Sequence, residues 1–100
     1  MNIQFHPSGF VASEQLKEFI EKKVSKLETF YDKIIDADVY MKLENHQQIK
    51  DKTAEIKLNV PGITLFSAET AKTFEEAADE AVESLRRQLK KYKEKIKETY

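Results

Sequence analysis

The chain has 100 residues, of which 40% are hydrophobic and 35% are charged, and its formal net charge is −1. This size and hydrophobic content predict a single globular domain over residues 1–100 and exclude a disordered chain. There is no cysteine, and no apolar run approaches the roughly 20 residues of a membrane span, so disulfides, thiolate chemistry and a spanning helix are excluded.

The N-terminal third of the chain predicts a strand followed by a helix. Residues 1–6 alternate between apolar and polar side chains, which indicates a short half-buried strand, and the following Pro-Ser-Gly predicts its end. Ser13 is suited to cap a helix, and Glu14 suits the positive first turn. Apolar residues then recur every three or four positions, which predicts an amphipathic helix over residues 14–31. Its apolar stripe consists of Leu16, Phe19, Ile20, Val24, Leu27, Phe30 and Tyr31.

The middle of the chain predicts three strands, because the hydrophobic period changes to two. Residues 37–44 and 54–60 each alternate apolar with polar side chains, and the polar run 45–52 between them predicts a loop. Pro61-Gly62 then predicts a turn into a fourth strand over residues 63–68. The register of this strand stays open: a direct pairing across the turn would bury Leu65, whereas a longer loop would bury Phe66 instead.

The C-terminal part predicts one long helix that begins at a capping box, with Thr73 as the cap and Glu76 three residues later. At 1.5 Å per residue, up to about 27 residues would span about 40 Å. Its apolar stripe consists of Phe74, Ala78, Ala81, Leu85, Leu89, Tyr92 and Ile96. The resulting order, β-α-β-β-β-α, predicts an α+β domain whose four-stranded sheet carries both helices on one face and polar side chains on the other.

The sequence offers no clear site for catalysis or for a cofactor. His6 and His46, the two histidines, are forty residues apart without any cysteine, which does not fit a metal site. No phosphate-binding glycine motif is present, and the many carboxylates fall on helix surfaces beside lysines. The N-terminus also lacks a signal-peptide pattern. We expect a cytoplasmic protein that is not an enzyme, takes no small-molecule substrate and does not contact a membrane.

The long helix is strongly polarised in charge. Residues 73–85 carry five acids and no base, whereas residues 86–98 carry seven bases and two acids. On a helical wheel, Arg86, Lys90, Lys93 and Lys97 lie on one flank of the apolar stripe, and Arg87, Lys91 and Lys95 lie on the opposite flank. The helix macrodipole favours this sign of asymmetry, but its effect fades beyond the last turn. The number of bases favours binding of a polyanion instead.

The first helix adds a second group of bases. Lys22 and Lys26 flank its apolar stripe, and Lys23 projects almost into it. Because a buried unpaired ammonium is too costly, Lys23 either emerges at a groove or forms a salt bridge. Two basic helix edges side by side suit the backbone of structured RNA. Stacking of unpaired bases is less favoured, because the predicted strands carry no aromatic cluster of the kind that stacks bases. The predicted RNA-binding residues are Lys22, Lys23, Lys26, Arg86, Arg87, Lys90, Lys91 and Lys95.

Several segments are similar to one known family, in the same order along essentially the whole chain. They are residues 23–28 (Lys-Val-Ser-Lys-Leu-Glu), the turn at residues 59–62 (Asn-Val-Pro-Gly) and residues 85–93 (Leu-Arg-Arg-Gln-Leu-Lys-Lys-Tyr-Lys). Together with Asp79 and the order of elements, they resemble the bacterial ribosome hibernation promoting factor family, also called ribosome-associated inhibitor A or sigma-54 modulation protein.

This resemblance implies a protein that binds the small ribosomal subunit and its rRNA in the decoding channel and there blocks messenger and transfer RNA. It implies rRNA contacts at Lys23, Lys26, Arg87, Lys91 and Lys95. The chain departs from the family at residues 73–75, where an Asp-x-Tyr pattern is common, and at Thr29, where a base is common. Because the chain ends at Tyr100, it looks like a short form without the C-terminal dimerisation domain, and we expect a monomer when free.

An alternative is a protein-interaction module that pairs through the long helix and binds no RNA. Heptad spacing permits such pairing, in the sets Ala78, Leu85, Tyr92 and Val82, Leu89, Ile96. The same residues are also needed to cover the sheet. Salt distinguishes the two functions, because RNA binding weakens steeply with salt and helix pairing does not.

Overall fold

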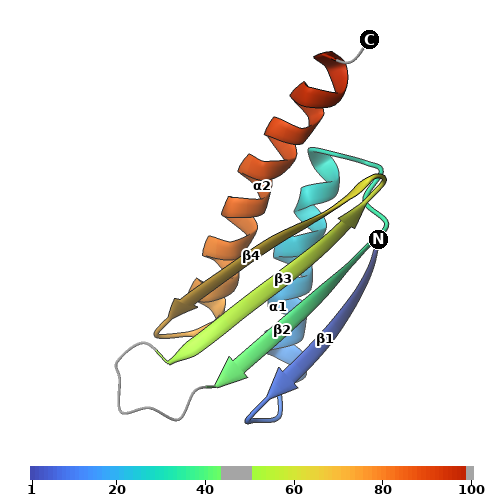
Figure 1. The fold of residues 1–100 in the computed structure, drawn as a ribbon. Coiled ribbons are helices and arrows are strands. Elements are labelled where there is room, and N and C mark those ends of the chain that lie inside the picture. The colour runs from blue at the N-terminus through green and yellow to red at the C-terminus, as the bar shows by residue number, and fades with distance from the viewer. Residues whose placement is uncertain (44–50, 99–100) are drawn as a thin grey trace.

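The structure is a computed structural model that describes residues 1–43 and 51–98. Its elements follow the predicted order, and the predicted α+β class is confirmed (Figure 1). They are β1 (Asn2–Ser8), α1 (Glu14–Ser25), the 3-10 helix η1 (Lys26–Thr29), β2 (Asp36–Leu43), β3 (Lys52–Val60), β4 (Ile63–Ala71) and α2 (Phe74–Glu98). Neither helix in the described ranges has the length and apolar character needed to cross a membrane.

The four strands form one sheet in the order β1-β2-β3-β4, with both helices on the same face (Figure 1). β1 pairs with β2 in parallel because α1 carries the chain back between them, whereas the other neighbours are antiparallel. Val60 pairs directly with Ile63, so Leu65 faces the core, which resolves the open register. Gly62 makes this tight turn possible, because its φ of +92° is unfavourable for residues with a side chain.

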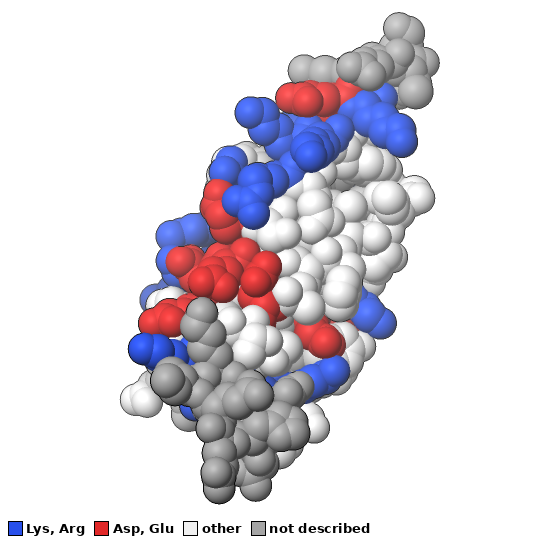
Figure 2. Space-filling model, turned by 60° about the vertical axis from the view of Figure 1, so that its left-hand side comes forward, with Lys and Arg blue, Asp and Glu red and all other residues white. Residues whose placement is uncertain are grey.

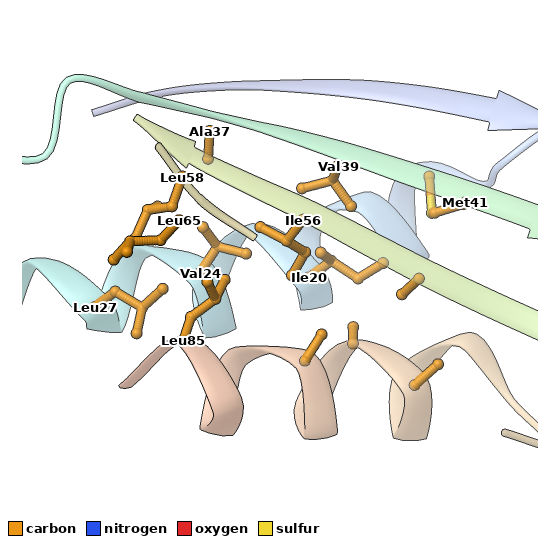
Figure 3. Close-up of a cluster of buried hydrophobic side chains, with 14 of the residues drawn as sticks. Ile20, Val24, Leu27, Ala37, Val39, Met41, Ile56, Leu58, Leu65 and Leu85 are labelled. Atoms are coloured by element: carbon orange, nitrogen blue, oxygen red, sulfur yellow. The ribbon is translucent and has the colours of Figure 1, made fainter. Parts of the chain in front are cut away.

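The core lies between the sheet and the two helices (Figure 3). The alternation that predicted β2 and β3 places one side of each strand against the helices and leaves the other side polar. Three alanines of α2, Ala77, Ala78 and Ala81, are completely buried, so small side chains face the sheet along the first half of that helix. The largest fully buried side chains are Ile20, Val24, Leu27, Val39, Met41, Ile56, Leu58, Leu85 and Leu89.

The predicted helix over residues 14–31 is too long, because the α-helix ends at Ser25 and continues as η1. The hydroxyl of Thr29 donates to the Lys26 carbonyl at 2.6 Å, and the backbone N–H of Phe30 donates to the Leu27 carbonyl at 3.0 Å. This tighter winding keeps Leu27 fully buried but turns Phe30 outward, where it is 42% exposed. Phe30 is therefore not part of the core stripe that the sequence predicted.

Three predicted strand boundaries are also wrong. β1 continues through Pro7 to Ser8, which an edge strand allows because one side of its backbone needs no partner. β4 continues to Ala71 because β3 pairs with it along its whole length, and Lys52 belongs to β3 rather than to the loop. Most of the predicted 45–52 loop lies outside the described residues.

Candidate nucleic-acid interface

A groove runs between α2 on one side and α1 with η1 on the other; we call it the inter-helix groove. Phe30 and Arg86 lie at its middle and line both of its halves. The half nearer the start of α2 is lined by Lys23, Lys26, Leu27, Asp79, Val82 and Glu83. The half nearer the C-terminus is lined by Thr29, Lys90, Lys93 and Glu94. Five bases thus contribute to one groove.

Lys23 lies in the first half of the groove, where a nearby carboxylate partly offsets its positive charge. Its ammonium lies 3.2 Å from the Asp79 carboxylate and 5.5 Å from the centre of the Phe19 ring. Both expectations for Lys23 are met, since it lines the groove and also forms a salt bridge. The Lys23–Asp79 pair therefore bridges α1 and α2 across this end of the groove.

Arg86 is held in place by Glu83, one turn earlier on α2. Its Nε donates to both carboxylate oxygens at 3.1 Å, and its NH2 group donates to one of them. These hydrogen bonds hold the pKa of Glu83 below its usual value, and Glu83 raises the pKa of Arg86. The pair is accessible to solvent, so it orients the guanidinium more than it stabilises the fold.

Lys90 and Lys93 make the second half of the groove basic, and both are exposed. The ammonium of Lys93 donates to the Phe30 carbonyl at 2.6 Å, which ties α2 to the end of η1. Lys93 was placed on this flank by the helical wheel but was not among the predicted site residues. The contact of Lys93 depends on the position at which η1 ends, and the hydrophobic periodicity of the sequence does not indicate that position.

The remaining predicted bases of α2 do not line the inter-helix groove. Arg87 is 63% exposed on the outer surface of the helix, 3.9 Å from Glu83, and Lys91 and Lys95 are exposed beyond it. We call Arg87, Lys91 and Lys95 the outer basic edge. Lys22 lies on the outer side of α1, in a hollow that it shares with Lys26. The predicted residues therefore do not form one continuous surface: most line the groove or the outer basic edge, and Lys22 lies apart on the outer side of α1.

The charge polarity of α2 is visible on the surface. Figure 2 shows lysine and arginine gathered over the C-terminal half of the helix and acids over its N-terminal half. In this view, much of the neighbouring sheet surface carries no charge. Among the described residues, no group of three or more histidine and acidic side chains is placed to hold a metal ion.

The outer face of the sheet carries an aromatic group that the sequence analysis did not identify. His6 stacks on Tyr40 with their ring centres 4.7 Å apart, and its Nε2 lies 2.9 Å from the Asp38 carboxylate. The ammonium of Lys57 lies 5.5 Å from the centre of the same Tyr40 ring. These residues come from three adjacent strands, so only the strand register could have brought them together. Acids and bases are mixed here, unlike on α2.

The heptad positions proposed for helix pairing are largely used inside the domain. Ala78, Leu85 and Leu89 are completely buried against the sheet, and the hydroxyl of Tyr92 donates to the Pro61 carbonyl. A partner helix would have to displace the sheet to reach them. The structure therefore favours a surface-charge interaction over a coiled coil.

Comparisons with known proteins agree with this fold. Residues 2–97 match the family described as sigma 54 modulation protein / S30EA ribosomal protein. The chain is 33% identical over 98 residues to the ribosome hibernation promoting factor of Escherichia coli strain K12, covering 98% of this chain and 99% of that one. It is 29% identical over 96 residues to the ribosome hibernation promotion factor of Bacillus subtilis, where the match covers 96% of this chain and 50% of the relative.

Two solved structures are similar over almost their whole length. The N-terminal domain of Protein Y from Thermus thermophilus has a TM-score of 0.80 at 26% identity, covering 92% of this chain and 99% of that one. A ribosomal subunit interface protein from Coxiella burnetii has a TM-score of 0.81 at 26% identity, covering 93% and 98%. The chain spans about half of the longer Bacillus relative and nearly all of the shorter Escherichia coli one. With the family model matching residues 2–97, the chain belongs to the sigma 54 modulation protein / S30EA ribosomal protein family, which includes the ribosome hibernation promoting factors.

Proposed function

We propose that this chain binds the rRNA of the small ribosomal subunit in the cytoplasm and occupies the decoding channel, where it blocks messenger and transfer RNA. Its role is to inhibit translation and keep ribosomes idle, without catalysis. The observation that carries this proposal is the gathering of exposed bases on the C-terminal half of α2, in both the inter-helix groove and the outer basic edge. Relatives named ribosome hibernation promoting factors support the choice of the ribosome as the partner.

The geometry of the outer basic edge suits a phosphate backbone. Arg87, Lys91 and Lys95 are spaced four residues apart, so their side chains follow one another along the helix at about 6 Å intervals. They are exposed, so a phosphate can reach them without disturbing the core. Glu83 lies 3.9 Å from Arg87 and competes there, whereas no ion pair is found for Lys91 or Lys95 among the described residues. Each phosphate contact releases condensed counterions, so the affinity must fall steeply with salt.

The inter-helix groove contributes differently, because its first half contains acids. Asp79 and Glu83 already engage Lys23 and Arg86, so an RNA phosphate there has to compete with a carboxylate. Lys90 and Lys93 form no ion pair with an acid among the described residues. We therefore place the stronger phosphate contacts at the C-terminal half of the groove and on the outer basic edge.

Co-sedimentation tests this function directly. Purified protein is mixed with isolated small subunits or isolated large subunits over a salt series, and the bound fraction is measured. We expect binding to small subunits at low salt that declines steeply as salt increases, and weaker binding to large subunits. Equal binding to both subunits, or binding that does not change with salt, would contradict the proposal.

A further inference from the structure

Phe30 is a large aromatic side chain that the fold holds at the surface beside cations. Its ring is 42% exposed because η1 turns it away from the core. The ring lies in the inter-helix groove, where Thr29, Arg86, Lys90 and Lys93 surround it. Burial of an exposed aromatic ring against a ligand is normally favourable. An exposed ring beside lysine and arginine is therefore suited to a planar ligand that carries negative charge.

Contacts on both sides hold Phe30 in this position. Its backbone N–H donates to the Leu27 carbonyl at 3.0 Å, and its own carbonyl accepts from Lys93 at 2.6 Å. The guanidinium carbon of Arg86 lies 5.8 Å from the centre of the ring, while Glu83 holds the nitrogens of the same guanidinium. The backbone of Phe30 and the guanidinium of Arg86 are therefore held in place before a ligand binds, which lowers the ordering cost of binding.

An unpaired nucleotide has the chemistry that this site fits. Its base presents a planar face that can stack on an aromatic ring, and its phosphate carries the charge that Lys90 and Lys93 can neutralise. A base inside a duplex is already stacked and cannot reach the ring. Glu94 at the rim adds a hydrogen-bond acceptor, which an exocyclic amino group of a base can meet and a phosphate cannot.

We propose that the C-terminal half of the inter-helix groove is a binding site for a single unpaired RNA nucleotide, with the base stacked on Phe30 and the phosphate beside Lys90 and Lys93. This inference rests on the proposed function, because it specifies how the chain reads RNA that it binds. It departs from the sequence-based prediction, which favoured contacts to the RNA backbone over stacking of unpaired bases. RNA is then recognised through an extruded base as well as through phosphates.

The test uses an RNA hairpin with the fluorescent base 2-aminopurine at one loop position, and a second hairpin with the same base in the stem. Stacking quenches its fluorescence. Wild-type protein should quench the loop probe and leave the stem probe unchanged. Phe30→Leu keeps an apolar side chain but removes the ring, and should lose the quenching and weaken loop binding about 5- to 150-fold, the range for one stacked base. Phe30→Trp should retain both effects.

Phe66→Leu is the matched control, because Phe66 is similarly exposed at 47% but projects from the opposite face of the sheet. It should behave like the wild type, and melting curves of all variants verify folding. The proposal is overturned if Phe30→Leu quenches and binds like the wild type, if Phe66→Leu shows the same loss, or if the wild type does not quench the loop probe. Co-sedimentation of the wild type with small subunits is scored separately, so the proposed function can stand when the nucleotide site fails.

Discussion

Neutralising the outer basic edge gives a quantitative test of the proposed RNA binding. The variant Arg87→Gln, Lys91→Gln, Lys95→Gln removes three positive charges from exposed positions, so the stability should change by no more than about 0.5 kcal/mol per site. If each residue contacts one phosphate, the slope of log affinity against log salt should fall in magnitude by about 2.7. Between about 50 and 200 mM salt, this difference corresponds to roughly 40-fold.

Small-subunit binding is measured at four or more salt concentrations for the wild type, this variant and a control of equal charge. The control, Lys17→Gln, Lys57→Gln, Lys72→Gln, removes three charges away from the basic half of α2 and should keep the wild-type slope. Lys23 is left unchanged because its loss would leave Asp79 without its partner across the helices. If the outer-edge variant keeps the wild-type slope and affinity, these bases do not contact RNA, and the helix macrodipole is sufficient to explain them.

Three further predictions concern the scaffold, each measured by urea or thermal unfolding. Leu27→Ala should cost about 2–5 kcal/mol, because Leu27 is completely buried where η1 meets the core; a loss below 1 kcal/mol would mean that η1 packs loosely. Gly62→Ala should destabilise by about 1 kcal/mol or more, since φ is +92° and a new Cβ would lie 3.0 Å from the Tyr92 hydroxyl; a neutral result would contradict the turn geometry. Ser13→Ala should cost about 1 kcal/mol, because the Ser13 hydroxyl accepts from the Leu16 N–H at 3.1 Å; an unchanged midpoint would show that this cap is dispensable.

Much of the fold could be predicted because its local patterns agree with its tertiary structure. The period of two in β2 and β3 and the long apolar stripe of α2 follow directly from which faces are buried. The caps at Ser13 and Thr73 also form as predicted, with Glu76 donating its backbone N–H to the Thr73 hydroxyl at 3.1 Å. The prediction of secondary structure fails where the backbone changes from an α-helix to a 3-10 helix. At Thr29 and Phe30 a 3-10 turn interrupts the helical period, and a period-based prediction continues through it.

The candidate site was harder to predict than the fold, because it depends on how the two helices are placed. A helical wheel separates Arg86 from Arg87 but does not say which flank faces α1. The acids that pair with Lys23 and Arg86 likewise could not be predicted, because several acids lie nearby and the packing of the helices determines which one each base contacts. Phe30 was assigned to the core from its spacing alone. Its exposure depends on the hydrogen bonds that end η1, which no composition or periodicity rule reports.

The most direct test of the central claim is competition on the small subunit. Isolated small subunits are incubated with the protein, and the binding of a fluorescent messenger RNA and of a transfer RNA is then measured by filter retention. If the protein occupies the decoding channel, protein bound at saturation should prevent both ligands from binding, and the outer-edge variant should restore their binding in proportion to its lost affinity. Simultaneous binding of all three to the same subunit would contradict occupation of the decoding channel.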